Sequence, residues 1–383
     1  MSFVFDPEDP AVHADLHAHY RTLRDEHPVY AHPSGKLWTL SRYADVEGAL
    51  LDPETFCSAG VEEAGALLPM MVYMDGARHD ALRKLVSRAF TPRRVEALEP
   101  RIREAVGRLF DAWHGKDRGD LMQDVALLLP NLVISELIGI PEARRHAFLE
   151  CTEALIRIGA GGAADIRKPA EGIYAEFTTL LEERRADRRD DLMSALIDAE
   201  IDGGHLTQDE LLGFCFLLVV GGSDTTTNLI GNGAVLLARH PEQRDWLVQD
   251  PSRIPNAIEE MFRYEAPTQS QPRRPARDVA LHGKTIPEGA RVVLLLGSAN
   301  LDERRWPDAE RFDVSREVGW HLALGKGAHY CLGANLARME SRLAFEALLE
   351  RHPSFELAET PDWAPSRWAR HHPSIPLRLR AGS

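Results

Sequence analysis

The sequence predicts a mainly α-helical protein with a smaller β component. Between residues 92 and 200, apolar side chains recur at helical spacing almost throughout. Thr207 and Glu210 then form a capping-box pattern, which indicates a helix that starts there and runs to about His240, before Pro241. At 1.5 Å per residue such a helix would be about 50 Å long. The segments with strand character are short and lie at 29–31, 37–40 and 292–296.

Helices are also expected near both ends of the chain. The first is predicted at Asp15–His27, because Leu16, Tyr20 and Leu23 share one of its faces. The last is predicted at 332–350, and short strand-like pieces follow it in 354–379. Within the helical region 92–200, glycine and proline predict breaks at 115–119, 141, 159–162 and 169.

The composition is that of an ordinary globular chain. Of its 383 residues, 44% are hydrophobic and 27% are charged, and the net charge of −14 argues against a nucleic-acid partner. The longest strongly apolar run, Leu211–Val220, is far shorter than the roughly 20 residues of a membrane span. The N-terminal segment has no signal-peptide pattern, and the four cysteines lack the spacing of a metal finger. We therefore expect a cytoplasmic monomer without disulfides or membrane attachment.

A glycine-punctuated segment at 324–335 carries the most specific chemistry. It delivers Cys331 to the start of the helix expected at 332–350, where unpaired N–H groups and partial positive charge stabilise a thiolate. Gly325 and Gly327 allow a tight turn, and Gly333 leaves room for a flat group against the backbone. A thiolate beside a bare backbone suits an iron that binds through sulfur. A buried structural cysteine is the ordinary alternative.

This segment resembles the haem-binding loop of cytochromes P450, whose pattern runs Phe-Gly-x-Gly-x-His-x-Cys-x-Gly. The chain matches every position except the first, where Leu324 replaces the aromatic residue. The resemblance covers the chain from about Leu16 to Leu379. It implies the mostly helical cytochrome P450 fold with a small β-rich lobe. It also implies one haem domain that spans residues 1–383, with no fused reductase.

Other motifs of the family occur in the expected order. His79 and Arg83 stand four residues apart, so they share one face of a helix, and they match a pair that binds haem propionates. An exposed basic helix is the ordinary alternative. Arg273 matches another propionate-binding arginine, with Arg274 as the adjacent alternative. The resemblance gives His329, in the cysteine loop, the same role.

Two glycines interrupt the long helix predicted at 207–240. Gly221 and Gly222 each cost about 1 kcal/mol relative to alanine, and Asp224 and Thr225 follow them in an apolar stretch. Thr225 can bond back to the carbonyl of Gly221 and open the helix locally. A kink or a close-packing site would explain the pattern equally well. The segment also resembles the family's oxygen-activation segment, which implies that Asp224 and Thr225 deliver protons.

Two further segments match structural motifs of the family. Glu260 and Arg263 stand three apart on one helical face, where most such pairs are surface ion pairs of little energy. They resemble the family's Glu-x-x-Arg pair, which supports the haem core together with an arginine such as Arg316. The segment 299–302 resembles a motif that has arginine where this chain has Leu301, so local ion pairing is expected to differ there.

The resemblance implies a haem-thiolate monooxygenase that inserts one oxygen atom from O₂ into a small apolar organic substrate. Cys331 is then expected to be the axial ligand of iron in haem b, iron protoporphyrin IX. Electrons are expected from a separate ferredoxin and its reductase, because no reductase module is apparent. By position only, the substrate pocket is expected to include Leu67, Met70, Met71, Leu217, Val220, Gly221, Gln269 and Gln271.

Alternatives remain at two points. A peroxide-dependent haem enzyme and a non-catalytic haem sensor have no need of the pair Asp224 and Thr225, so its presence favours the monooxygenase. The run 78–94 is rich in arginine and, with Lys326, Arg338 and Arg342, is expected to receive an acidic ferredoxin. A solvated helix face is the ordinary reading of such charges. The sequence does not identify the substrate.

Overall fold

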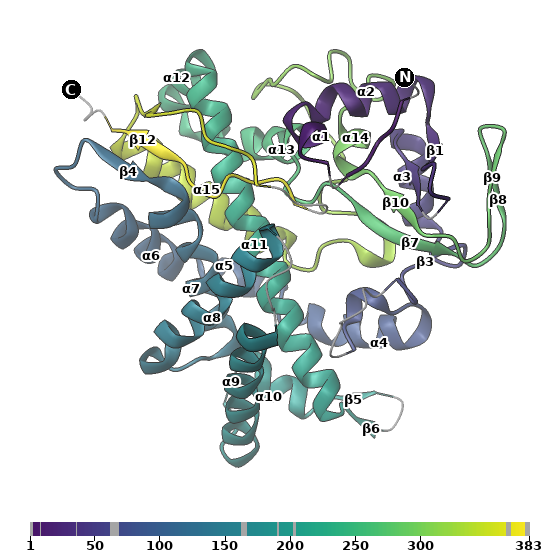
Figure 1. The fold of residues 1–383 in the computed structure, drawn as a ribbon. Coiled ribbons are helices and arrows are strands. Elements are labelled where there is room, and N and C mark those ends of the chain that lie inside the picture. Colours follow the sequence, from purple (N-terminus) through teal and green to yellow (C-terminus); the bar gives the residue numbers. More distant parts are fainter. Residues whose placement is uncertain are drawn as a thin grey trace. The chain divides into compact units, whose positions relative to one another are not determined.

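A computed structural model describes residues 3–7, 9–35, 37–61, 69–161, 167–189, 191–201, 204–364 and 369–379, with the backbone alone at 10, 153–161, 167–169 and 201. The chain forms two compact units (Figure 1). Unit 1 comprises Met1–Glu63, Asn232–Cys331 and Asp362–Pro373. Unit 2 comprises Ala64–Gly231, Leu332–Pro361 and Ser374–Ser383.

Unit 1 contains most of the strands. Its helices are α1 (Pro10–Ala14), α2 (Leu16–Glu26), α3 (Tyr43–Leu51), α12 (Pro241–Gln249), α13 (Ile254–Tyr264) and α14 (Leu296–Asn300), with the 3₁₀ turns η3 (Pro251–Arg253) and η4 (Gly327–His329). Its strands are β1 (Val29–Ala31), β2 (Trp38–Leu40), β3 (Phe56–Cys57), β7 (Gln271–Pro275), β8 (Val279–Leu281), β9 (Lys284–Ile286) and β10 (Val292–Leu294).

Unit 2 is mostly helical. Its helices are α4 (Gly76–Ser87), α5 (Pro92–Glu96), α6 (Glu99–Asp111), α7 (Leu128–Ile138), α8 (Glu142–Gly161), α9 (Arg167–Ala186), α10 (Leu192–Ile197) and α15 (Ala334–Arg351), with the 3₁₀ turn η1 (Met71–Tyr73) and the π-turn η2 (Met122–Ala126). Its strands are β4 (Arg118–Asp120), β5 (Glu200–Ile201), β6 (Gly204–His205), β11 (Glu356–Leu357) and β12 (Pro376–Arg378). Within the described part of the chain, none of the helices has the length and apolar character that a membrane crossing requires.

A five-stranded sheet in the order β1-β2-β10-β7-β3 organises unit 1. β10 is parallel to β2 and antiparallel to β7, so that Val292 lies opposite Trp38 on one side and Arg273 on the other. Leu50 of α3 and Leu322, just before the cysteine loop, belong to the buried apolar cluster that includes this sheet. The hairpin of β8 and β9 extends away from the sheet (Figure 1). The cysteine loop therefore starts from the core of unit 1.

A buried ion pair joins α13 to the rest of unit 1. Arg263 and Glu260 are both fully buried, and the guanidinium donates two hydrogen bonds of 2.7 Å to the carboxylate. Arg263 also donates to the backbone carbonyls of Asn300 and Ala309, at 2.9 and 2.7 Å. Arg316 reaches the same carboxylate at 3.4 Å. The pair is thus a core element with the expected third partner, and it is not a surface ion pair.

The long helix α11 (Gln208–Arg239) confirms the capping-box prediction. Thr207 accepts the N–H of Glu210 at 3.2 Å, and the Glu210 carboxylate accepts the N–H of Thr207 at 2.9 Å. Arg78 of α4 also donates to Glu210, at 2.6 Å. Burial raises the pKa of the Glu210 carboxyl, but hydrogen bonds from Arg78 and Thr207 outweigh that effect and leave the pKa below its usual range. The helix start is therefore fixed both locally and by α4.

Several sequence predictions were wrong in detail. Residues 92–200 are not helical throughout, because Arg118–Asp120 forms β4, which pairs with β12 near the other end of the chain. Pro169 does not break a helix: it is the third residue of α9, in the first turn, where proline removes no helical hydrogen bond. The strand predicted at 292–296 ends at Leu294, and α14 begins at Leu296.

Hydroxyl side chains attach one face of α11 to the neighbouring helices of unit 2. The Ser223 hydroxyl donates to the side-chain oxygen of Asn131 in α7, at 2.9 Å. The Thr227 hydroxyl donates to the carbonyl of Ala126 in η2, also at 2.9 Å. Both hydroxyls are buried, so these bonds satisfy polar groups that would otherwise destabilise the core. Ser223 and Thr227 are therefore structural residues of α11.

The two central glycines of α11 lie on different faces. A Cβ at Gly222 would come within 2.7 Å of the Ile134 side chain of α7, closer than real contacts allow. A Cβ at Gly221 would meet no described atom within 4 Å. Gly222 thus permits close helix packing, as one of the two ordinary interpretations predicted, and Gly221 faces open space. The helix remains α-helical through both residues.

Alanine substitutions at the two glycines should therefore have different effects. Gly221→Ala should stabilise the protein by up to about 1 kcal/mol, the usual advantage of alanine over glycine in a helix. Gly222→Ala should lose that advantage, because overpacking against Ile134 costs about 1–3 kcal/mol. Unfolding midpoints from far-ultraviolet circular dichroism check both. In the Gly222→Ala background, Ile134→Val should recover part of the loss, and equal midpoints for the two alanine variants would contradict this packing.

Candidate functional site

The cysteine loop of unit 1 is a tight turn closed by backbone hydrogen bonds. The N–H of Cys331 donates to the carbonyl of Leu324 at 2.8 Å, and the N–H of Gly325 donates to Leu322 at 2.9 Å. Gly325 and Gly327 have φ of +69° and +68°, a left-handed conformation that side chains disfavour. The Cys331 thiol is free of disulfides and partly exposed. The loop thus presents one thiol from a fixed backbone.

Neighbouring segments of unit 1 hold this loop from outside. A Cβ at Gly327 would lie 2.8 Å from the carbonyl oxygen of Leu50, so only glycine lets the loop approach α3 this closely. Lys326 forms an ion pair with Glu47 on the same helix. His329 lies 3.1 Å from the hydroxyl of Ser58, measured from its Nε2. Glu47 and Ser58 were not among the predicted site residues, because nothing in their local sequence connects them to residues 270 or more positions later.

The helix after the cysteine starts later than predicted. α15 begins at Ala334, with Gly333 as its N-cap residue, whereas the sequence indicated a start at Leu332. Cys331 therefore precedes the first helical residue by three positions. A Cβ at Gly333 would meet no described atom within 4 Å, so the backbone there borders open space, as predicted for this glycine.

Strand β7 places the two candidate arginines on opposite faces. Arg273 is buried, and it donates to the carbonyl of Pro272 at 2.7 Å and to the side chain of Gln271 at 3.2 Å. Arg274 is exposed and lies against the loop at Gly289, 3.4 Å from a Cβ placed there. Of the two, only Arg273 shares the face of β7 that is directed into unit 1.

Helix α4 in unit 2 carries the other predicted pair of basic side chains. His79 is 1% exposed and Arg83 is partly buried, one helical turn apart. The Nδ1 of His79 lies 3.1 Å from the carboxylate of Asp80. The expected helix is therefore present, and its histidine points inward, contrary to the alternative of a fully exposed basic helix.

One stripe of α11 is less buried than the rest of the helix. It includes Leu217, Val220, Gly221, Asp224 and Thr225, which follow one another at helical spacing. The Thr225 hydroxyl donates to the carbonyl of Gly221 at 2.9 Å, which confirms the predicted back-bond. Asp224 accepts a hydrogen bond of 3.1 Å from Asn228. The five predicted site residues of this helix thus share one face.

The remaining residues predicted for the substrate pocket differ in their surroundings. Met70 is partly buried, Met71 is buried next to it in η1, and Leu67 lies outside the described residues. Gln271 is partly buried beside Arg273. Gln269 is 6% exposed, accepts a hydrogen bond from the hydroxyl of Tyr20 at 2.9 Å and donates to Ala266 at 2.7 Å. Both the oxygen and the nitrogen of its side-chain amide are therefore hydrogen-bonded within unit 1.

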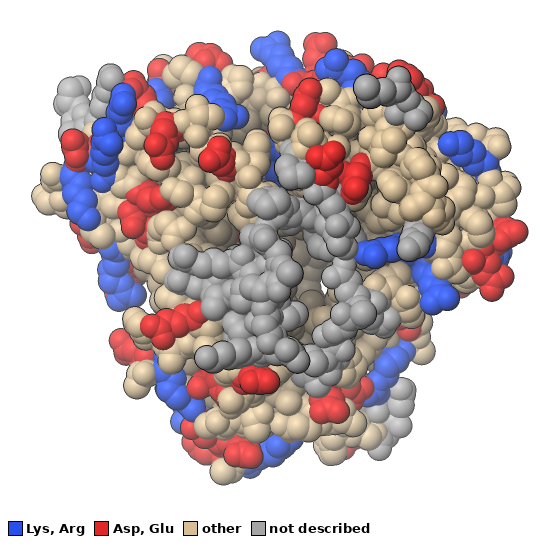
Figure 2. All heavy atoms as spheres, in the orientation of Figure 1, with Lys and Arg blue, Asp and Glu red and all other residues tan. Residues whose placement is uncertain are grey.

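Several of the basic residues expected to receive a partner already have carboxylate partners. Arg342 pairs with Glu99 and Glu346, each at 2.8 Å, and Lys326 and Arg78 pair with glutamates as described above. Arg93 on α5 is exposed. On the face drawn in Figure 2, acidic and basic side chains are interspersed. The charges of Arg78, Lys326 and Arg342 are thus neutralised by glutamates within their own units.

Comparisons with known proteins agree over nearly the whole chain. A family model described as Cytochrome P450 matches residues 163–368. Cytochrome P450 107B1 of Saccharopolyspora erythraea is 39% identical, over 97% of this chain and 96% of that protein. The vitamin D(3) 25-hydroxylase of Pseudonocardia autotrophica is also 39% identical, over 89% of this chain and 87% of that protein. The structure of cytochrome P450 CYP109Q5 from Chondromyces apiculatus aligns with a TM-score of 0.91 at 37% identity, covering 99% of both chains. The chain therefore belongs to the cytochrome P450 family of haem-containing monooxygenases.

Proposed function

We propose that this protein inserts one oxygen atom from O₂ into a small apolar organic substrate, by hydroxylation or a related oxidation. The observation that carries the proposal is the Cys331 loop, whose backbone hydrogen bond to Leu324 fixes the position of a cysteine that forms no disulfide, in a chain of this family. Haem that is bound through a cysteine thiolate supplies the activation of O₂. The protein's own residues bind the haem, position the substrate and supply protons.

The residues present fit a haem group in chemistry and in space. Open space borders the backbone at Gly333 and Gly221, where a side chain would obstruct a flat ligand. We assign Cys331 as the axial ligand of haem b. Carboxylates bind best to cations and hydrogen-bond donors, and the side chains assigned to the two haem propionates are of this kind. They are His79, Arg83, Arg273 and His329. One haem domain over residues 1–383 remains the prediction from the sequence.

Asp224 and Thr225 are assigned to proton handling. The hydroxyl proton of Thr225 is held by the carbonyl of Gly221, so the hydroxyl oxygen keeps lone pairs that can accept another hydrogen bond. The Asp224 carboxylate accepts a hydrogen bond from Asn228, and an ionised carboxylate can accept several hydrogen bonds at once. A proton taken up at Asp224 can reach the neighbouring hydroxyl through a water molecule. Monooxygenation consumes protons, whereas a haem sensor or a peroxide-dependent enzyme has no need of this arrangement.

The substrate is proposed to be small and apolar. The side chains on the open stripe of α11 near the acid and alcohol are Leu217 and Val220, and Met71 in η1 is apolar as well. Val220 is 38% exposed, so its side chain is available for contact with an apolar ligand. Gln269 is omitted from the proposed pocket, because its amide is engaged within unit 1. The relative from Pseudonocardia autotrophica is named for 25-hydroxylation of vitamin D(3), an apolar compound. A screen of apolar compounds by spectral shift of the haem tests the proposal.

A separate ferredoxin is the proposed electron donor, and Arg93 is the residue best placed to show it. Arg93 is exposed at the start of α5, within the basic run. Lys326 is less suitable than expected from the sequence, because its charge is paired with Glu47. A monomer in the cytoplasm remains the prediction from the sequence.

Cys331→Ser should abolish the thiolate type of absorption spectrum in the reduced, carbon-monoxide-treated protein. The reason is that a serine hydroxyl does not replace a thiolate as an iron ligand. The helical far-ultraviolet circular dichroism should be retained. Cys57→Ser is the matched control, because Cys57 lies in β3 and has no assigned role. An unchanged carbon-monoxide spectrum in Cys331→Ser would show that the ligand lies elsewhere.

Thr225→Ala should keep haem binding and substrate affinity but divert electrons to hydrogen peroxide. The measurement is product and peroxide formed per NAD(P)H consumed, with a competent ferredoxin system. Thr227→Ala is the control, because its hydroxyl bonds to Ala126 on the structural face of α11. That control should lose stability, by about 1 kcal/mol or more, without losing coupling. Equal coupling in Thr225→Ala and the parent would remove Thr225 from the proton path.

Arg93→Glu should slow reduction by an acidic ferredoxin about twofold to tenfold at low salt and flatten its salt dependence. Stopped-flow reduction at several salt concentrations measures both effects. Reduction by dithionite should be unchanged, since it needs no docked protein. Arg118→Glu changes the same charge at an exposed arginine of β4, outside the basic run. If both variants behave alike, the donor responds to net charge and does not dock at α5.

A further inference from the structure

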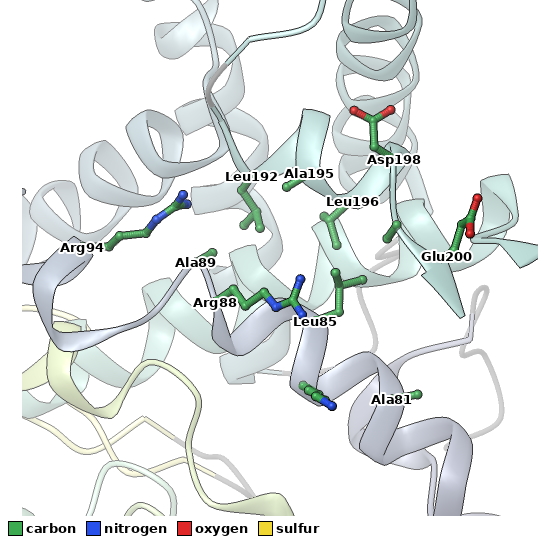
Figure 3. Close-up of a pocket in the computed structure, with 12 residues that line it drawn as sticks. Ala81, Leu85, Arg88, Ala89, Arg94, Leu192, Ala195, Leu196, Asp198 and Glu200 are labelled. Atoms are coloured by element: carbon green, nitrogen blue, oxygen red, sulfur yellow. The ribbon is translucent and has the colours of Figure 1, made fainter. Parts of the chain in front are cut away.

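A pocket of about 540 Å³ lies within unit 2 and contains none of the residues assigned to the haem, the substrate or proton handling, although three of its cations belong to the basic run 78–94. The second half of α4, α5, α10 and the start of β5 surround it (Figure 3). Its volume lies in the range of small-molecule sites, roughly 300–1,000 Å³. Neither the haem nor the proposed substrate requires it.

The wall of this pocket is largely apolar. Leu85 and Ala89 contribute from α4 and the residues just after it, and Leu192 and Leu196 contribute from α10. Leu192 and Leu196 are buried at 4% and 1% exposure, so they are fixed parts of the unit. Such a surface favours a hydrocarbon group over an inorganic ion.

Three cations surround the apolar wall, and within the described part of the chain they have no carboxylate partner. Lys84, Arg88 and Arg94 line the pocket and are exposed. Among the described residues, none forms an ion pair with any of these three side chains. Several other surface arginines of unit 2 do pair with carboxylates: Arg101, Arg103, Arg108 and Arg144. In a chain with a net charge of −14, three unpaired cations around one pocket leave positive charge available to a ligand.

Two acidic residues limit the kind of anion that fits. Asp198 pairs with Arg188 at 2.8 Å, and Glu200 lies 3.8 Å from His205. Figure 3 shows Arg94 on one side of the pocket and the two acids on the other, with Leu192 and Leu196 between them. Arg88 is drawn nearer the middle, so an anionic group is attracted most strongly to the part of the pocket away from the two acids. A second anionic group at the far end of a ligand would meet carboxylates.

We propose that this pocket binds an amphipathic organic monoanion, a carboxylate on a hydrocarbon body. The carboxylate lies among Lys84, Arg88 and Arg94, where charge-assisted hydrogen bonds to guanidinium groups are strong. The hydrocarbon lies against the apolar lining, where Leu85 and Ala195 are the more exposed residues, and replaces water there. This site is distinct from the substrate pocket and does not depend on the haem chemistry proposed above.

The probe is decanoate, and isothermal titration calorimetry of the whole haem-loaded protein measures its binding. Decan-1-ol has the same hydrocarbon without charge, and acetate has the charge without the hydrocarbon. Decanedioate adds a second carboxylate at the far end. Decanoate should bind at least tenfold more tightly than each of the three. Equal affinity for decanedioate and decanoate would overturn the orientation in which the acids face the hydrocarbon end.

Amino-acid substitutions test whether decanoate binds in this pocket. The triple variant Lys84→Gln, Arg88→Gln and Arg94→Gln should weaken decanoate binding at least tenfold, because it removes the three cations that line the pocket. Ala195→Trp keeps all charges but fills the pocket from an exposed position on α10, and it should weaken binding similarly. Arg93→Gln is the control on α5, since Arg93 does not line the pocket. It should change affinity less than twofold.

The outcomes separate this site from the active site. Decanoate that binds at the proposed substrate pocket shifts the haem spectrum. Loss of the calorimetric signal in the triple variant and in Ala195→Trp reports binding at the site beside α10 alone. Decanoate affinity in the triple variant and in Ala195→Trp that equals the parent's overturns the proposal. It is also overturned if decanoate does not bind while the triple variant weakens association with an acidic ferredoxin, because the surface then serves a protein partner.

Discussion

The position of the cysteine loop depends on one buried ion pair in unit 1. Arg263 donates hydrogen bonds to the carboxylate of Glu260 and to the backbone carbonyl of Asn300. The side-chain oxygen of Asn300 accepts the N–H of Leu322 at 2.7 Å. Leu322 in turn accepts the N–H of Gly325, the first glycine of the loop. A continuous series of hydrogen bonds therefore leads from α13 to the turn that holds the thiol. Removing one partner of a buried pair costs about 3–5 kcal/mol, since the other charge stays buried.

In the middle of α11, residues that pack against other helices alternate with the residues proposed for proton handling. Ser223 and Thr227 bond to α7 and η2, and Gly222 lets α7 approach, so this face fixes the helix in unit 2. Asp224 and Thr225 lie on the stripe that stays less buried. Because successive helical residues point about 100° apart, adjacent positions can have unrelated roles. The rigidity of the first face is what would hold the acid and the alcohol in place for proton transfer.

What the sequence predicted correctly is mostly local. The capping box, the back-bond of Thr225 and the spacing of Glu260 and Arg263 each involve residues within one or two helical turns, where periodicity determines the geometry. The motif with Leu301 was also interpreted locally. The structure adds that Leu301 is 1% exposed in an apolar cluster with the N-terminal helices, which explains how a leucine replaces the arginine of the family motif.

What the sequence could not predict involves distant partners. Strand β4 exists because β12 pairs with it from the other end of the chain, and its three residues carry no strand pattern of their own. The same holds for Glu47, which pairs with Lys326 and thereby alters the expected basic face. The substrate pocket is the extreme case, because its residues were inferred from position alone. Gln269 shows the limit of that reasoning, since its hydrogen bonds to Tyr20 and Ala266 become visible only in the folded unit.

Helix α4 brings the two proposed anion sites onto one element. His79 and Arg83 form one stripe, and Lys84 and Arg88 form another, each with a spacing of four residues. At about 100° per residue, the step of five from one stripe to the other turns the helix by roughly 140°. One stripe includes the buried histidine assigned to the haem propionates, and the other lines the pocket beside α10. The two proposals together would account for the basic character of this helix, because each of them requires positive charge on a different stripe.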